Sequence, residues 1–236
     1  MGVKAESSSK TRLEEALEGV RMMIESKILQ SKTNEVGIIL FGTEDTDNPL
    51  AEDMGDGNYE NVTVLAPLER PAVSLTAQLE EDVKPGIVSA DLIDGLVVAV
   101  DMMHRRTDKK KYIRSIYLIT AAANPIDGDG DLEPICERLQ AMDTDLYVIG
   151  ADFVHSTKEE GSVIKEEGSV HKEEGPVVKS EVVDEDGGDA LMTKRENEKM
   201  LVSIVEATSG RVIPAKDLVA RFSVMHGKQV RPTKSK

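Results

Sequence analysis

Residues 35–41, EVGIILF, form a continuous apolar run that breaks abruptly into the polar stretch GTEDTDNPL. A strand without polar alternation is buried on both faces, as in a parallel sheet covered by helices on both sides. The polar stretch, with Pro49 near its end, is typical of a loop whose Asx and Thr side chains hold their own backbone. Local chemistry therefore favours a structural loop here over a metal site.

Helical and strand patterns alternate along most of the chain, which predicts an α/β fold with a mostly parallel sheet and right-handed crossovers. Strands are expected at 35–41, 59–65 (an edge strand), 112–120, 146–153 and in the RVIP segment; helices are expected at 9–29 behind a serine cap, 71–83, 89–105, 132–142, 192–206 and 215–225. The layout is Rossmann-like. However, the chain opens on a helix, where such folds have a first strand in the middle of the sheet.

A repeat interrupts this pattern, because KEEG recurs every seven residues from Lys158, Lys165 and Lys172. Each unit carries a helix-breaking Gly and one or two apolar residues, so disorder is favoured over a coiled coil. Residues 158–189 hold four lysines and eleven acids, a net charge of −7. The expected organisation is a main α/β part at 1–153, an acidic disordered insertion at 154–190, the last helices and strand of the same domain at 191–226, and a basic tail at 227–236.

Composition narrows the possible functions. The formal net charge of −15 argues against this chain providing the main contact surface for DNA or RNA. Aromatic residues make up only 3% of the chain, which argues against a surface that binds single-stranded nucleic acid by stacking on its bases. The single cysteine, Cys136, fits a reducing compartment and is interpreted as a small buried hydrophobe on a helix. No apolar run is long enough to span a bilayer, so a soluble intracellular protein without membrane contact is expected.

The sequence contains no Walker A or GxGxxG motif and no catalytic constellation. Asp127, Asp129 and Asp131 match the first ligand spacings of a calcium loop, but Leu132 and Arg138 occupy the positions that require Gly and Glu. This segment is interpreted as a solvated loop, with Asp131 capping the next helix. The remaining candidates are interpreted as structural or surface groups: the helix-cap residue Asp91, its i+3 neighbour Asp94, and His104, His155, His171 and His226.

The run NEVGIILFGTEDTDNPL closely resembles the N-terminal von Willebrand factor A-like domain of the large subunit of the Ku heterodimer, of the fungal type. The resemblance continues in YENVTVL, VKPGIVSADLIDGLVVAVDMM and YIRSIYLIT, and more weakly in GRVIPAKDL. It covers roughly residues 10–153 and returns near 196–218. The residues that carry the family signature are Phe41, Gly42, Thr43, Thr46, Asp47, Asn48 and Pro49.

This resemblance implies a nuclear DNA-end-binding complex of non-homologous end joining and telomere maintenance, although family members are often labelled ATP-dependent DNA helicases. It implies the small Ku subunit as heterodimer partner, together with repair or telomere proteins. DNA ends would be bound through the full complex and only weakly through this segment. The domain itself is expected to be a non-enzymatic protein-docking module without cofactor.

Two departures from the family pattern matter. Metal-binding von Willebrand A domains carry a DxSxS loop after the first strand and an acidic residue after the fourth strand. The DxSxS loop is missing from this sequence. Ala121 occupies the place of the acidic residue. No bound Mg²⁺ or Ca²⁺ is therefore expected. In addition, the family order places a first, central strand between 35–41 and 112–120, and its absence would leave two apolar strands with unpaired edges. Such a chain is expected to be unstable, and a truncated isoform or gene model is the hypothesis.

Two other functional classes remain open. A free-standing von Willebrand A scaffold or adhesion module would need a metal-dependent site, which Ala121 opposes. A small Rossmann-like enzyme is opposed by the absence of a phosphate loop. Thr157, Ser162, Ser169 and Ser180 lie beside acids and are possible kinase targets, although exposed linker serines are common.

Overall fold

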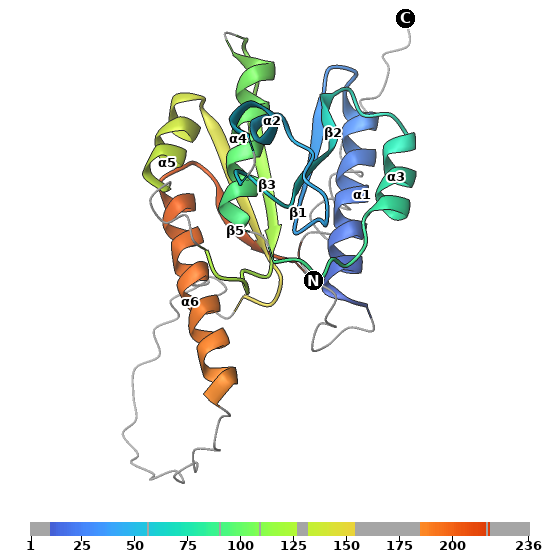
Figure 1. Ribbon diagram of the computed structural model, residues 1–236. Coiled ribbons are helices and arrows are strands. Elements are labelled where there is room, and N and C mark those ends of the chain that lie inside the picture. Colours follow the sequence, from blue (N-terminus) through green and yellow to red (C-terminus); the bar gives the residue numbers. More distant parts are fainter. Residues whose placement is uncertain are drawn as a thin grey trace, which may run out of the picture.

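The computed structural model describes residues 10–55, 57–89, 91–108, 110–126, 132–153, 185–215 and 217, and every structural statement below concerns these residues. They form an α/β arrangement in which helices cover both faces of the strands (Figure 1). This confirms the α/β class that the alternating sequence pattern predicts. The expected solvated loop at 127–131, the KEEG repeats and the basic tail lie outside the described residues.

The five strands form two sheets rather than one. β1 (Val36–Phe41) pairs antiparallel with β2 (Val62–Glu69), while β3 (Arg114–Thr120), β4 (Thr144–Gly150) and β5 (Arg211–Pro214) form a parallel sheet in that order. The described residues provide no strand between β1 and β3. The edges facing each other are thus unpaired by any described strand, as expected for a sheet that lacks its central strand.

Six helices connect and cover these strands. They are α1 (Arg12–Gln30), α2 (Pro49–Met54), α3 (Ser74–Asp82), α4 (Leu92–Thr107), α5 (Leu132–Ala141) and α6 (Glu185–Glu206). α1 begins with a capping box in which the Thr11 hydroxyl accepts from Glu14 N and the Glu14 carboxylate accepts from Thr11 N. α4 is capped by Asp91, whose carboxylate accepts from Ile93 N at 2.7 Å.

Two apolar cores lie on opposite faces of the strands. On one face, α4, α5 and α6 pack on β3 and β4 around buried residues such as Leu96, Leu139 and Leu201. On the other face, α1 and α3 pack on β1 and β2 around Ile24 and Leu79. α1 also reaches the second sheet, because Met22 and Met23 pack against Ile149 and Ile213; the helix therefore bridges both sheets.

Several element boundaries differ from the sequence-based expectations. The N-cap of α1 is Thr11 rather than a serine, because Thr11 has the Glu14 partner of a capping box. β2 runs from Val62 instead of from residue 59, since Tyr59 and Asn61 adopt positive φ angles of 51° and 58° that interrupt an extended strand. α2 was not expected at all: Asn48 caps it and Pro49 starts it.

The largest boundary difference concerns α6. It begins at Glu185, so residues 185–190, expected to belong to a disordered insertion, are helical. These six residues, EDGGDA, include two glycines and two aspartates of low helix propensity, so local propensity does not explain why α6 begins this early. The helix expected at 215–225 lies mostly outside the described residues.

Candidate functional site

The loops that follow β1, β3 and β4 gather at one end of the sheets, which we call the carboxyl edge. β3 and β4 are parallel by their pairing. β1 runs in the same direction, because Glu35, before β1, pairs with Arg106, and Arg114, which opens β3, donates to Thr107 at 2.8 Å. Both strands therefore start beside the end of α4 and finish near its beginning. In α/β folds this carboxyl edge is where ligands normally bind.

The loop at 41–49, which follows β1, is fixed through its backbone. The amides of Gly42 and Thr43 donate to the Asn61 carbonyl at 2.8 and 3.2 Å. Further along, Asp47 N donates to the Val62 carbonyl at 3.1 Å and the Asp47 carbonyl accepts from Val64 N at 2.8 Å. These bonds place Asp47 in an isolated parallel bridge with Thr63 of β2.

Two uncharged side chains of this loop, Thr46 and Asn48, bond to nearby backbone, mainly that of residues 59–62. Asn48, only 2% exposed, accepts from Ala51 N at 2.9 Å and donates to the carbonyls of Tyr59 and Val62 at 3.1 and 2.9 Å. Thr46 accepts from Asn61 N at 2.8 Å. These bonds are the structural role that the sequence predicted for the TDNP run, and they engage Thr46 and Asn48 in local bonding.

Three acids of the same loop remain at the surface: Glu44, Asp45 and Asp47 are exposed. The Asp45 carbonyl, rather than its side chain, is used internally, since it accepts from Thr43 Oγ1 at 2.7 Å. A rigid backbone thus presents an exposed acidic surface at the carboxyl edge, which we call the acidic rim. Within the described ranges no three His, Cys, Asp or Glu side chains form a group that could hold a metal ion.

Also at the carboxyl edge, α6 covers the end of β3. Lys194 Nζ donates to the Ala121 carbonyl at 3.0 Å and to Glu198 Oε1 at 2.8 Å. Asn197, on the same helix, donates to the carbonyls of Ala122 and Asn124 at 2.9 and 2.7 Å. The Ala121 carbonyl, at the end of β3, therefore accepts a hydrogen bond from a lysine of α6.

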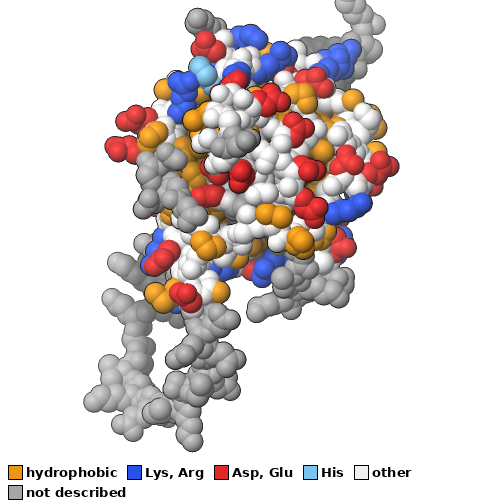
Figure 2. Space-filling model, viewed as in Figure 1, with side chains coloured by type: hydrophobic (Ala, Val, Ile, Leu, Met, Phe, Trp, Pro, Cys, Tyr) orange, Lys and Arg blue, Asp and Glu red, His pale blue; other side chains and the backbone are white. Residues whose placement is uncertain are grey.

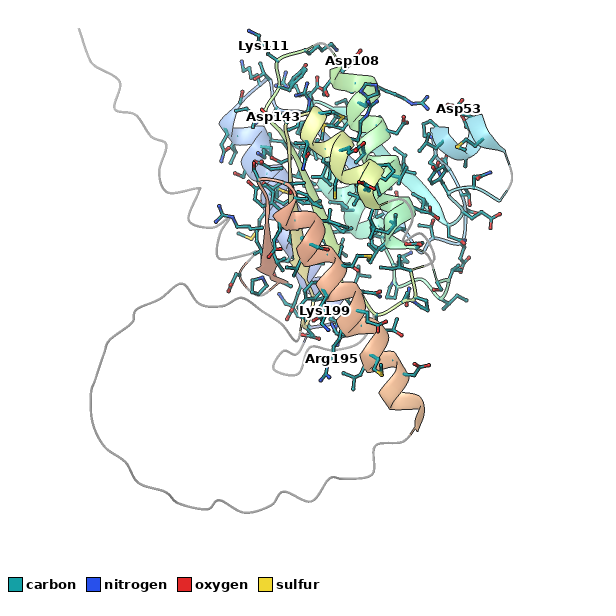
Figure 3. The ribbon with its side chains drawn as sticks, turned by 90° about the vertical axis from the view of Figure 1, so that its left-hand side faces the viewer. Asp53, Asp108, Lys111, Asp143, Arg195 and Lys199 are labelled. Atoms are coloured by element: carbon teal, nitrogen blue, oxygen red, sulfur yellow. The ribbon has the colours of Figure 1, made fainter. Side chains whose placement is uncertain are left out.

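Sequence reasoning did not single out Lys194, Asn197 or Glu198. Their spacing places them on one face of a helix, but only packing shows that this face meets the β3 loop. Glu198 is 1% exposed, and Lys194 Nζ also lies 5.2 Å from the centre of the Phe153 ring. Figure 3 shows that Arg195 and Lys199, on the same helix, lie at the opposite end of the molecule from Lys111 and Asp108.

The other residues considered from the sequence do not come together as a site. Asp91 caps α4, and His104 lies in the last turn of that helix. Cys136 is partly buried on α5, and burial raises the pKa of its thiol, which disfavours the reactive thiolate. His155, His171, His226 and the three acids of the calcium-like loop lie outside the described residues.

Across the described part of the chain, no helix combines the length and apolarity needed to cross a membrane. No residue of the loop at 41–49 is among the described ionisable groups whose pKa is shifted. Arg106 lowers the pKa of Glu35 by hydrogen bonding, and burial raises the pKa of Tyr117, whose ring stacks on Tyr147 at 5.0 Å between centroids. Neither group forms a catalytic arrangement.

Comparison with known proteins gives a consistent result. Residues 1–167 match the family model described as the Ku70/Ku80 N-terminal alpha/beta domain. The "X-ray repair cross-complementing protein 5" of Dictyostelium discoideum is 28% identical over 224 residues, 95% of this chain and 25% of that protein. The "ATP-dependent DNA helicase 2 subunit KU80" of Arabidopsis thaliana is 40% identical over 107 residues, which are 44% of this chain and 15% of that protein. The "ATP-dependent DNA helicase II subunit 2" of Schizosaccharomyces pombe is 36% identical over 123 residues, which are 52% of this chain and 17% of that protein. The chain thus spans a quarter or less of the length of these relatives.

Proposed function

Because the chain belongs to the Ku70/Ku80 N-terminal alpha/beta domain family, we propose that it acts as a protein-docking domain of the large subunit of a Ku-type complex. The complex would bind DNA ends in double-strand break repair by non-homologous end joining. The assignment to the large subunit is supported by the names of the relatives, which include KU80 and subunit 2. Nuclear localisation and a role at telomeres are parts of the same proposal.

The single observation that carries the docking role is the acidic rim. Glu44, Asp45 and Asp47 are exposed on a loop whose backbone and remaining polar side chains are already hydrogen-bonded within the domain. A rigid charged surface binds a complementary partner with little loss of conformational entropy. The same negative charge repels phosphates, so this domain would contribute little to holding DNA ends.

The local chemistry of the carboxyl edge supports binding rather than catalysis. The side chains of Asn48, Lys194 and Asn197 are engaged with backbone carbonyls. A catalytic role would require such groups to face a substrate. We therefore propose a non-enzymatic domain, although several relatives carry the word helicase in their names.

The partners proposed for this domain are the small Ku subunit and basic surfaces of repair or telomere proteins. The test is co-purification of the 236-residue chain with the small Ku subunit, together with retention on DNA ends, using the full-length large subunit as control. Partner capture with weak DNA retention is expected. Strong end binding by the chain alone, or absence of any partner when the full-length subunit captures one, would contradict the proposal.

A matched pair of variants locates the docking surface. Replacing Glu44, Asp45 and Asp47 with Lys reverses three exposed charges on the rim, and replacing Glu80, Glu81 and Asp82 with Lys reverses three exposed charges at the end of α3. Loss of partner capture is expected only for the rim variant. Equal loss in both variants would mean that net charge, rather than this surface, controls capture.

A further inference from the structure

The loop that follows β3 contains a backbone conformation that is unusual for its residue. Ala122 has a φ angle of 52°, in the left-handed region, and it is only 2% exposed. Glycine adopts this region without steric cost, and Asn and Asp adopt it more readily than other residues, as Asn61, Asp143 and Asp152 do in this chain. An alanine has neither advantage. The conformation at Ala122 therefore costs free energy, which surrounding contacts must offset.

Those contacts come from two residues of α6. Asn197, 6% exposed, donates to the carbonyls of Ala122 and Asn124 at 2.9 and 2.7 Å. Lys194 donates to the Ala121 carbonyl at 3.0 Å. Three carbonyls within a stretch of four residues thus accept hydrogen bonds from one face of α6, and we call these three bonds the α6 latch.

The latch acts on a short part of the loop. On one side of Ala122, its amide donates to Thr120 Oγ1 at 3.0 Å; on the other side, its carbonyl accepts from the latch. Pro125 disfavours helical backbone at Asn124, so the conformational freedom of the loop is concentrated at residues 121–123. Ala123, Asn124 and Pro125 are exposed. A change of φ at Ala122 would therefore change the surface of the carboxyl edge.

The latch lies where α6 first meets the rest of the described domain. The side chains that α6 buries begin at the latch and continue toward its end: Asn197, Glu198, Leu201, Ile204 and Val205. Before the latch, Leu191 and Met192 are 45% and 60% exposed. Figure 1 shows this start of α6 extending past the ends of the strands, and Figure 2 shows apolar and acidic side chains exposed there. A displacement of the projecting start therefore reaches the latch before it reaches the apolar core.

We propose that α6 and the loop at 121–124 form a conformational switch. While Lys194 and Asn197 donate to the loop carbonyls, Ala122 is held in the left-handed region. When the start of α6 moves away, Ala122 relaxes to a negative φ and the exposed residues after it change position. One state carries backbone strain and the other lacks the latch bonds, so a partner that binds the relaxed loop also favours the displaced helix. This switch does not depend on the proposed docking role.

The first test measures the backbone at Ala122 in the complete 236-residue chain. NMR coupling constants report φ at this residue, and hydrogen exchange reports the protection of its amide. The parent chain should show a positive φ and a protected amide. Asn197→Ala removes two of the three latch bonds, so φ at Ala122 should become negative and its amide should exchange about tenfold faster or more.

Two controls accompany this variant. Glu196 is exposed at the neighbouring position of α6, so Glu196→Ala should leave both readings at Ala122 unchanged. Asp143 has a φ of 51° and lies after α5, where its amide donates to the Gln140 carbonyl at 3.0 Å. Its φ should stay positive in every variant, which shows that the change at Ala122 is local.

A second measurement needs no substitution, and it decides the result if Asn197→Ala does not fold. Hydrogen exchange of the parent chain in increasing denaturant groups the amides that open together. The Ala122 amide should open with the amides of α6 from Lys194 to Leu201. It should open before the amides of β4, Thr144–Gly150.

Two results would overturn the proposal. The first is a positive φ at Ala122 in a folded Asn197→Ala variant, because the loop would then keep its conformation without the latch. The second is exchange of the Ala122 amide with those of β4, or separately from those of α6, because helix and loop would then not move as one unit.

Discussion

Lys194 and Glu198, one turn apart on α6, form an ion pair of 2.8 Å whose carboxylate is 1% exposed. The lysine also donates to the Ala121 carbonyl at 3.0 Å, so the pair attaches α6 to the end of β3. A buried pair of this kind stabilises a particular packing arrangement more clearly than it raises net stability. Lys194 and Ala121 are 73 positions apart in the sequence, so their hydrogen bond holds together two distant segments at the carboxyl edge.

Removing one partner of this pair should therefore cost more than removing both. Glu198→Leu leaves the ammonium of Lys194 without its carboxylate in a mostly buried site, and we expect a loss of about 2–4 kcal/mol in the free energy of unfolding. Lys194→Met combined with Glu198→Leu should recover at least half of that loss. Urea unfolding measures both, with Lys199→Met, an exposed lysine of the same helix, as a control that changes little. Additive losses in the double variant would contradict the coupling.

Asn48 is expected to be the residue on which the rim loop depends. Asn48→Ala removes the cap of α2 and two bonds to carbonyls beside β2, a loss of about 2–3 kcal/mol in unfolding free energy. Asp45→Ala removes an exposed side chain and should change stability by less than about 0.5 kcal/mol. Chemical denaturation of the two variants measures the difference; similar losses would mean that the loop is held by its backbone bonds alone.

Gly210 allows β5 to approach β4. A Cβ at this position would overlap the Leu146 carbonyl oxygen, so Gly210→Ala must displace backbone rather than a flexible side chain. We expect a loss of about 3 kcal/mol or more, or failure to fold. Ser209→Ala, at the exposed neighbouring position, should be nearly neutral. Thermal unfolding followed by circular dichroism compares the two, and an unchanged melting temperature for Gly210→Ala would contradict this strand contact.

The Glu35–Arg106 pair should make stability depend on pH in a defined direction. Hydrogen bonding from Arg106 lowers the pKa of Glu35 in the folded chain, so its stabilisation is present above the unfolded pKa of about 4.3 and is lost as pH falls through the folded value. The melting temperature of Glu35→Gln should therefore lie below that of the parent chain at pH 7, and the difference should shrink below about pH 4.

A control separates this pair from the general effect of acid. Glu137→Gln changes an exposed acid on α5 and should give no comparable pH-dependent difference. A difference for Glu35→Gln that grows on acidification would contradict the assignment. Melting curves from pH 7 to pH 3 are sufficient for both variants.

Much of the fold was predictable from local patterns. The apolar runs at β1, β3 and β4 and the amphipathic spacing of α1 and α4 indicated alternating strands and helices, because burial of one face imposes those periods. The boundaries were less predictable: positive φ at Asn61 delays β2, and α6 begins at Glu185 although Gly187 and Gly188 have low helix propensity. The structural role of Asn48 was also predictable, since Asx side chains bond to nearby backbone.

The sequence by itself determined the α/β class, the family signature at 41–49 and the acidic character of the surface, because each depends on local chemistry and composition. Only the tertiary structure decided that β1 and β3 face each other across a cleft, and that Lys194, Asn197 and Glu198 cover the end of β3. The physical reason is that strand neighbours and helix docking depend on contacts between distant residues. Side-chain periodicity shows which face of an element is buried, but it does not show against what.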